Sequence, residues 1–342
     1  MFNLLKRRAF CVALAGFIAV QGFSGATPVQ AETKLLFNLF LPAKHSFKIG
    51  IFDPWAKTVM KESQGRVKVS FTTSTLGPPP KQWNVITKGI ADVAMLANSF
   101  ERNRLMLPLV AELPFTTPTA VNSSIALWKT QQQKFKKANE FKGVKLLGLW
   151  TTAPLNILHA KKPISAISDF KNQKIWGFPG AGVAILRSMG AVPVVVPAVK
   201  TFNVVSKGIV DGLVIANESL LSFKILPYIN HMTLVPGGVH AVSFSLLMND
   251  KKWAGLSTAD KDAIRKASGL NVARGARATD QRGTKALAAA DKKGVSRIQA
   301  SPSLIADLRK KLAPITEGWI RKAAKRGIDG RDAIAFYKSQ LE

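Results

Sequence analysis

Apolar and polar positions along the chain form short blocks that predict strands and helices in alternation. The apolar run 35–41 predicts a first strand, and residues 48–63 carry Ile51, Trp55 and Val59 at helical spacing before Gly65. Residues 66–71 alternate as a strand. Further strands are predicted at 90–97, 144–150, 157–160 and 243–248, with a helix after the rigid Gly77–Pro80 turn and another near 120–138.

The middle of the chain repeats a strand and helix unit. Strands are predicted at 174–178, 192–196 and 213–216, with helices at 183–189 and 201–207 between them. Because each strand is followed by a helix, the strands of this βαβαβ run should be parallel, with crossover helices. The pattern predicts a mixed α/β protein.

The C-terminal part is predicted to be mainly helical. Ser257 and Asp260 resemble a capping box, and no proline follows before Asp291. We therefore expect one long helix over 257–291, long enough to brace two lobes. Ser301-Pro302 begins another helix, and residues 332–340 form a last one.

The N-terminus predicts a signal peptide. Lys6, Arg7 and Arg8 precede an apolar run over 9–20, and Val29-Gln30-Ala31 is a small-x-small cleavage site. A membrane anchor is the competing interpretation, but the run is shorter than the about 20 residues that span a bilayer. We expect cleavage after Ala31 and a periplasmic mature protein. The single cysteine, Cys11, lies in the signal, so no disulfide is expected.

The chain is strongly basic. Without residues 1–31 it keeps 46 basic and 20 acidic residues, a formal net charge of +26. Nucleic-acid binding is disfavoured because the basic residues are spread along the chain and no known binding motif is present. A membrane-surface protein stays as an alternative. The charge favours the approach of anionic solutes.

Signatures of enzymes and of cofactor sites are missing from the sequence. We find no His/Cys metal spacing, no nucleophile elbow, no P-loop and no dinucleotide fingerprint. The glycine-rich stretch 177–182 contains Pro179 and lacks the acidic residue expected about 20 positions later. We therefore predict no catalytic residue, no metal and no cofactor, and keep a secreted enzyme on an unrelated α/β fold as the remote alternative.

Ordered short motifs resemble the solute-binding proteins of TRAP (tripartite ATP-independent periplasmic) transporters, the DctP family. They are PAKH at 42–45, SQGRVKV at 63–69, LG at 76–77, KGIAD at 88–92, ELPF at 112–115, KPI at 162–164, DFK at 169–171, MGAVP at 189–193 and KGIVDG at 207–212. The resemblance covers about residues 34–265.

This resemblance implies a two-lobe periplasmic-binding-protein fold with crossing strands and a long bracing helix. Lobe I would comprise 32–155, completed by about 245–285, and lobe II would comprise 156–244, completed by about 295–342. A small organic acid would bind in the cleft between the lobes, and the protein would deliver it to integral-membrane subunits of the transporter.

The sequence departs from the family at the residues that bind carboxylate. The family's usual arginine corresponds to Trp176, a second frequent arginine to about Leu155, and an acidic residue to Val214, with Glu218 four positions later. Trp176 is either a core-filling indole or an aromatic wall of the site. The ligand is then an acid with an aromatic or apolar body, or alternatively a neutral ligand or a cationic amine.

Other candidate ligand-binding residues follow from their positions at strand ends and crossings. They are His45, Trp83, Asn98, Phe100, Trp150, Asn156, Phe178, Asn217 and Glu218. Phe178 shares a strand face with Trp176 because it is two residues later. Arg102 and Arg104 are candidates to replace the missing positive charge, although a solvated surface position is the favoured interpretation.

Overall fold

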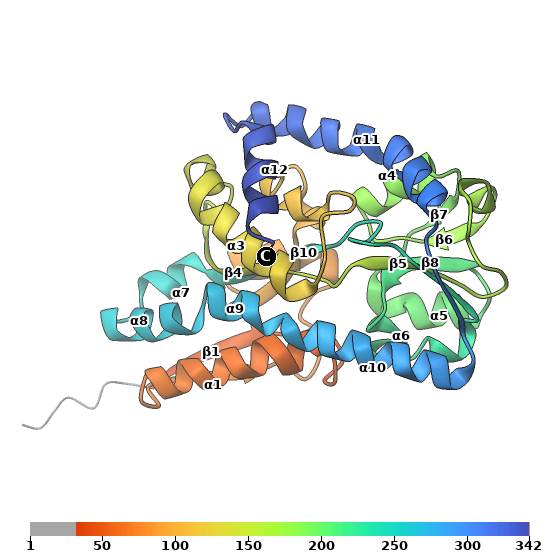
Figure 1. Ribbon diagram of the computed structural model, residues 1–342. Coiled ribbons are helices and arrows are strands. Elements are labelled where there is room, and N and C mark those ends of the chain that lie inside the picture. The colour runs from red at the N-terminus through yellow and green to blue at the C-terminus, as the bar shows by residue number, and fades with distance from the viewer. Residues whose placement is uncertain (1–31, 342) are drawn as a thin grey trace, which may run out of the picture. The chain divides into compact units, whose positions relative to one another are not determined.

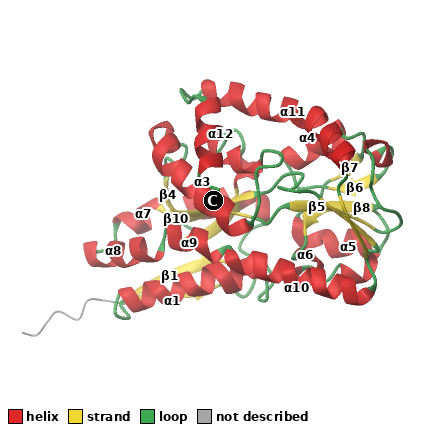
Figure 2. Cartoon of the chain, in the orientation of Figure 1, coloured by secondary structure: helices red, strands yellow, loops and turns green. Residues whose placement is uncertain are grey.

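The computed structural model describes residues 32–341, so the predicted signal peptide at 1–31 lies outside the described residues. Strands gather in two separate sheets, and helices surround both of them (Figure 2). The chain passes between the two sheets more than once (Figure 1). The predicted α/β fold with two lobes is therefore confirmed.

The first sheet has five strands in the order β2-β1-β3-β10-β4. Its strands are β1 (Thr33–Asn38), β2 (Val67–Phe71), β3 (Val93–Ala97), β4 (Val144–Thr151) and β10 (Ser243–Asn249). β1 pairs in parallel with β2 and β3, whereas β10 lies antiparallel between β3 and β4. All five residues of β3 and all seven of β10 are buried, as expected for strands covered on both faces.

Short helices pack around this sheet. They are α1 (Asp53–Glu62), α2 (Gln82–Thr87), α3 (Ala120–Thr130), α7 (Asp250–Ala254), α8 (Thr258–Ala267) and α9 (Leu270–Gly275). α3 and α9 contact β4, and α2 contacts β3 and β10. Thr119 begins α3 as its N-cap, because its side chain accepts a hydrogen bond from the backbone N–H of Asn122.

The second sheet has six strands in the order β11-β9-β5-β8-β6-β7. Its strands are β5 (Leu155–His159), β6 (Lys174–Trp176), β7 (Val192–Val194), β8 (Gly212–Ala216), β9 (His231–Leu234) and β11 (Ser296–Gln299). β6 pairs in parallel with both β7 and β8, which confirms the predicted βαβαβ run with helices α4 (Ala181–Ser188) and α5 (Thr201–Ser206). The short strands β9 and β11 were not predicted.

Two crossing segments join the sheets side by side. Thr152, directly after β4, donates its backbone N–H to the carbonyl oxygen of Val242, and Leu155 donates to that of His240. The Thr152 hydroxyl accepts the Val242 N–H in return, at 3.1 Å. These bonds tie the outgoing strand to the returning strand, so the two lobes share a two-stranded connection.

The expected single helix over 257–291 is wrong, because the chain forms three helices there. α8 ends at Ala267, and Gly269 takes a left-handed φ of +65° before α9. The Gly269 N–H donates to the carbonyl oxygen of Leu147, and a Cβ at this position would stand 3.0 Å from the Trp128 ring. A glycine with this conformation ends the first helix against the sheet.

The bracing role falls to the two longest helices. α10 (Arg277–Lys293) contacts α3 of the first lobe and α6 (Ser219–Ser222) of the second, and it runs along both in Figure 1. α11 (Pro302–Ala324) contacts α4 and leads to α12 (Gly330–Ser339). We expected residues 295–342 to complete lobe II. β11 does pair with β9 in the second sheet, but α12 packs against α3, which covers the first sheet.

Candidate functional site

A cavity lies between the two sheets. Its volume is about 70 Å³. Its lining comes from the loop after β1, the C-terminal ends of β3, β6 and β8, and the crossing segments. Ligands of α/β folds bind at the carboxyl ends of parallel strands, because loops from neighbouring strands meet there. The position of the cavity therefore makes it the candidate site.

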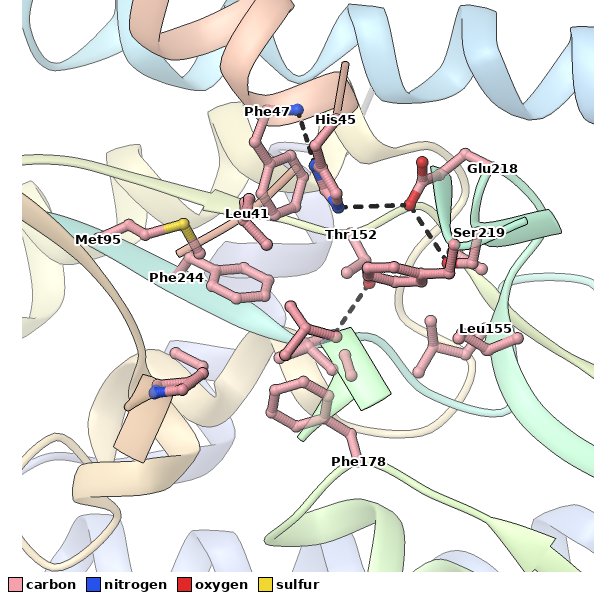
Figure 3. Close-up of a pocket in the computed structure, with 18 of the residues that line it drawn as sticks. Leu41, His45, Phe47, Met95, Thr152, Leu155, Phe178, Glu218, Ser219 and Phe244 are labelled. Carbon is pink, nitrogen blue, oxygen red and sulfur yellow. Dashed lines mark hydrogen bonds and ion pairs between the residues drawn. The ribbon is translucent and has the colours of Figure 1, made fainter. Parts of the chain in front are cut away.

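The walls of the cavity are aromatic. Seven rings line it: Phe40, Phe47, Phe100, Trp176, Phe178, Phe223 and Phe244. Phe178 from the second lobe lies with its ring centroid 5.5 Å from that of Phe100 and 6.4 Å from that of Phe244, both in the first lobe. Rings from both lobes thus meet across the cavity, and Figure 3 shows Phe178 and Phe244 facing it.

Trp176 is both a buried side chain and a wall of the cavity. It lies at the end of β6, paired with Val194 of β7 and Leu213 of β8, and is 1% exposed. Its indole N–H donates to the carbonyl oxygen of Val196 at 3.0 Å, which fixes the ring plane. The two alternatives posed by the sequence, core and wall, therefore describe the same side chain.

One end of the cavity is polar, with Glu218 at its centre. Glu218 follows β8 and is 4% exposed. Its carboxylate accepts hydrogen bonds from the hydroxyls of Ser46, Ser219 and Ser222. Arg282 of α10 donates through Nε to the Ser222 hydroxyl at 2.9 Å. The three hydroxyls supply hydrogen bonds to the buried carboxylate, and the Arg282 guanidinium, which reaches it through Ser222, offsets its negative charge.

His45 faces Glu218 from the loop after β1. The two point toward one another in Figure 3, with His45 Nε2 at 4.0 Å from Glu218 Oε1. His45 Nδ1 accepts the backbone N–H of Phe47 at 3.2 Å, so the ring proton of neutral His45 belongs on Nε2. Burial lowers the pKa of His45; the charge of Arg282 lowers it further, and that of Glu218 raises it. His45 is therefore neutral near pH 7.

Five of the ten candidate residues from the sequence line the cavity. They are His45, Phe100, Trp176, Phe178 and Glu218. Leu155, the position corresponding to the second family arginine, also lines it, whereas Val214 does not. These five side chains share a common space although they come from four separate stretches of the chain.

The three candidate asparagines pair with protein groups. Asn156 donates to Asn217 Oδ1 at 3.1 Å and accepts the Val235 N–H at 2.8 Å, which ties β5 to the loops beside it. Asn98 donates to the Ser243 hydroxyl at 3.0 Å and accepts from Ser245. These amides therefore support the strand ends around the cavity instead of lining it.

Two candidate tryptophans lie outside the lining. Trp150 is fully buried behind the wall, stacked on Phe244 at a centroid distance of 5.5 Å and an interplanar angle of 16°. Trp83 belongs to a second apolar cluster of the first lobe, and the Arg104 guanidinium lies 4.7 Å from its ring centroid. Trp150 thus holds a wall residue in place, whereas Trp83 is a core residue.

The missing positive charge is not replaced within the cavity. Arg104 stacks on Trp83, and Arg102 lines a separate groove under α11. Among residues 32–341, no lysine or arginine lines the cavity. In the same range, no group of His, Cys, Asp and Glu side chains is suited to hold a metal ion.

Several lining residues were missed by the sequence analysis. Phe47 and Phe223 flank the polar end, Phe244 is the second residue of β10, and Thr152 lies on the crossing segment. Thr152 follows the predicted strand 144–150 by two residues and Phe244 lies inside the predicted strand 243–248, whereas Phe47 and Phe223 follow predicted strands by six and seven residues. The orientation of the three loop residues could not be assigned, because loop residues have no regular side-chain period.

Comparisons with known proteins agree on one family. The family model for bacterial extracellular solute-binding proteins, family 7 (DctP), matches residues 37–322. The chain is 34% identical over 335 residues to the outer membrane transporter protein TsaT of Comamonas testosteroni, covering 98% of each.

Among the described residues, no helix has the length and apolar character needed to span a bilayer.

Solved structures give the same result. A TRAP periplasmic solute-binding protein from Bordetella bronchiseptica, with bound (R)- and (S)-mandelate, is 30% identical with a TM-score of 0.87, covering 90% of this chain and 98% of that one. A marine metagenome TRAP solute-binding protein specific for aromatic acid ligands is 27% identical with a TM-score of 0.83, covering 91% and 98%.

Proposed function

The chain belongs to the bacterial extracellular solute-binding proteins of family 7, and we propose that it captures a small organic acid with an aromatic body in the cavity between its sheets. As a TRAP-type solute-binding protein, it would then present the bound acid to the integral-membrane subunits of its transporter. Enclosure suits capture from dilute solution, because it removes most of the ligand surface from water.

The observation that carries this proposal is the aromatic wall with one polar end. Seven rings from both lobes surround the space, and its titratable lining groups, His45 and Glu218, stand together at one side. A flat ring can contact these walls by edge and by face, while its polar substituent meets the polar end. The excess of basic residues over the whole chain favours the approach of an anion.

The ligands of two relatives support the same class. Mandelate and aromatic acids occupy the structures that match this chain at 30% and 27% identity. The 70 Å³ cavity is smaller than the roughly 150 Å³ apolar cavity that admits benzene. A ring would therefore fit only when the lobes stand further apart than in this structure, and the lobes would close over it in that wider arrangement.

A second candidate is favoured by Glu218. This carboxylate lies in the lining while lysine and arginine do not, within the described residues. An aromatic amine would place its ammonium group against Glu218 and the surrounding rings, using an ion pair and cation–π contacts. Under this alternative the fold and the transport role stay the same, and only the ligand class changes.

A thermal-shift comparison separates the candidates. Benzoate, benzyl alcohol and benzylamine share one ring and differ in charge, and cyclohexanecarboxylate tests the need for an aromatic ring. A ligand at one hundred times its Kd stabilises the native state by about 2.7 kcal/mol. We expect benzoate to raise Tm most. A shift with benzylamine alone would select the amine, and unchanged Tm with every ring compound would refute the proposed site.

The proposed role also excludes turnover. Bound acid released by denaturation after prolonged incubation should have its original mass. A new product formed in excess over the protein would show an enzymatic activity and would contradict a pure binding role.

A further inference from the structure

Within the proposed function, we propose that Glu218 and the carboxylate of the captured acid share one proton, so that binding of the acid takes up a proton from solution. The proton would lie in an O–H···O bond between Glu218 and the ligand. His45 would donate its Nε2–H to the same pair. No covalent bond breaks: the free anion, one solvent proton and the ionised Glu218 combine into a singly charged carboxyl pair.

The inference starts from the charges around the cavity. Glu218 is the acidic group of the lining, His45 is neutral, and no lysine or arginine among residues 32–341 lines the space. Arg282 donates to the Ser222 hydroxyl, which in turn donates to the carboxylate of Glu218. The positive charge of Arg282 therefore offsets the negative charge of Glu218, and among the described residues of the lining no positive charge remains to pair with an anionic ligand. A bound anion would be a second buried negative charge without a partner, which proteins avoid by neutralising one of the two.

His45 is poorly placed to take that proton. Its Nδ1 already accepts the Phe47 N–H, so a proton on Nδ1 would put two donors face to face. The charged groups that act on it are Glu218 from the loop after β8 and Arg282 from α10, and burial opposes its charged form. His45 is thus set to donate through Nε2 in its neutral state.

Glu218 is well placed to take it. Its partners Ser46, Ser219 and Ser222 are hydroxyls, which can rotate to donate or to accept. A proton on the carboxyl group therefore leaves no buried donor or acceptor unmatched. Two carboxyl groups in contact cannot both stay ionised without a large cost, and sharing one proton is the known solution.

The substitution Glu218→Gln tests this directly, because an amide donates a hydrogen bond as the protonated acid does. Benzoate is the probe, since it has no second polar group. Titration calorimetry in two buffers of different protonation enthalpy measures the protons taken up. For the wild type we expect uptake approaching one proton, and a Kd that rises with pH by up to about tenfold per unit.

For Glu218→Gln we expect no uptake, a Kd independent of pH, and tighter binding than wild type at the alkaline end of the series. Glu112→Gln is the matched control, because Glu112 is also a buried carboxyl group but lies outside the lining. This variant should keep the wild-type linkage. His45→Gln should keep proton uptake, since the proton lies on the carboxyl pair and the amide can still donate. Its affinity should be weaker, because the amide does not reproduce the position of the imidazole Nε2–H.

The outcomes separate this inference from the proposed function. Benzoate binding without proton uptake at any pH would refute proton sharing and leave acid capture standing. Loss of uptake in His45→Gln would assign the proton to His45 and also refute it. Weaker benzoate binding by folded Glu218→Gln across the whole pH series would do the same. Binding of benzylamine and of no aromatic acid would overturn both proposals.

Discussion

Replacing Trp176 by alanine should weaken both the fold and the site. The indole is 1% exposed, and its removal opens a cavity and deletes the hydrogen bond to the Val196 carbonyl oxygen. Truncation of a buried tryptophan costs about 3–5 kcal/mol of unfolding free energy. One face of this ring borders an existing cavity, so the lower half of that range is expected.

The loss of affinity can also be bounded. An aromatic contact contributes roughly 0.5–1.5 kcal/mol beyond area burial. Since about 1.4 kcal/mol is a factor of ten, losing the contact alone should raise Kd for benzoate by about 2- to 12-fold. The ligand area that is no longer covered would raise it further.

Trp319 gives a matched control. It is 5% exposed, its indole N–H donates to the Met106 carbonyl oxygen at 3.1 Å, and it lies in the other apolar cluster. Trp319→Ala should lose a similar free energy of unfolding in urea and bind benzoate normally. Calorimetry is performed where all three proteins are folded. If both variants lose stability and both keep wild-type affinity, Trp176 is only a core residue and the wall assignment is refuted.

Three further predictions concern stability and export. Burial raises the pKa of Glu112 from 4.5 to about 7, so between these values the native state holds a proton that the unfolded state releases. The free energy of unfolding of wild type should therefore fall as pH rises from 4.5 to about 7. Relative to wild type, the free energy of unfolding of Glu112→Gln should rise by about 1.4 kcal/mol per pH unit in this range, as measured by urea titration. Gly50→Ala should cost about 1–3 kcal/mol because its Cβ would lie 2.2 Å from the Ala278 Cβ, whereas Gly283→Ala, which meets nothing within 4 Å in α10, should stabilise by about 1 kcal/mol; equal melting temperatures would contradict this. N-terminal sequencing of the exported protein should begin at Glu32, and a protein that keeps residues 1–31 would contradict cleavage.

The regular parts of the fold could be predicted from the sequence because their periods are local. The parallel order of β6, β7 and β8 follows from alternating apolar strands and helices. The break at Gly269 could not be predicted, because it depends on the contact with Trp128 in a distant helix. Residues that favour helices stand on both sides of that glycine, so the local sequence does not mark the break. The packing of α9 on β4 decides where the chain turns.

Position along the strands predicted which residues lie near the cavity better than side-chain polarity did. Strand ends indicated Phe178 and Glu218, and both side chains line the cavity, since loops after parallel strands converge. The side chains of Asn98 and Asn156 do not line the cavity, because these buried amides form hydrogen bonds with protein groups beside them. Apart from the Pro154 carbonyl oxygen beside Asn156, the partners of these amides are more than 60 residues away in the sequence, and no local pattern encodes them.

The strand order also decides when during synthesis this protein can fold. β10 inserts between β3 and β4, so the first sheet stays open in its middle until residue 249 has been made. The second sheet waits for β11 at 296–299, and α12 closes on α3 only after residue 330. Pairings between such distant segments form slowly, because long loops must close first. A growing chain therefore stays without either finished sheet until well past residue 249.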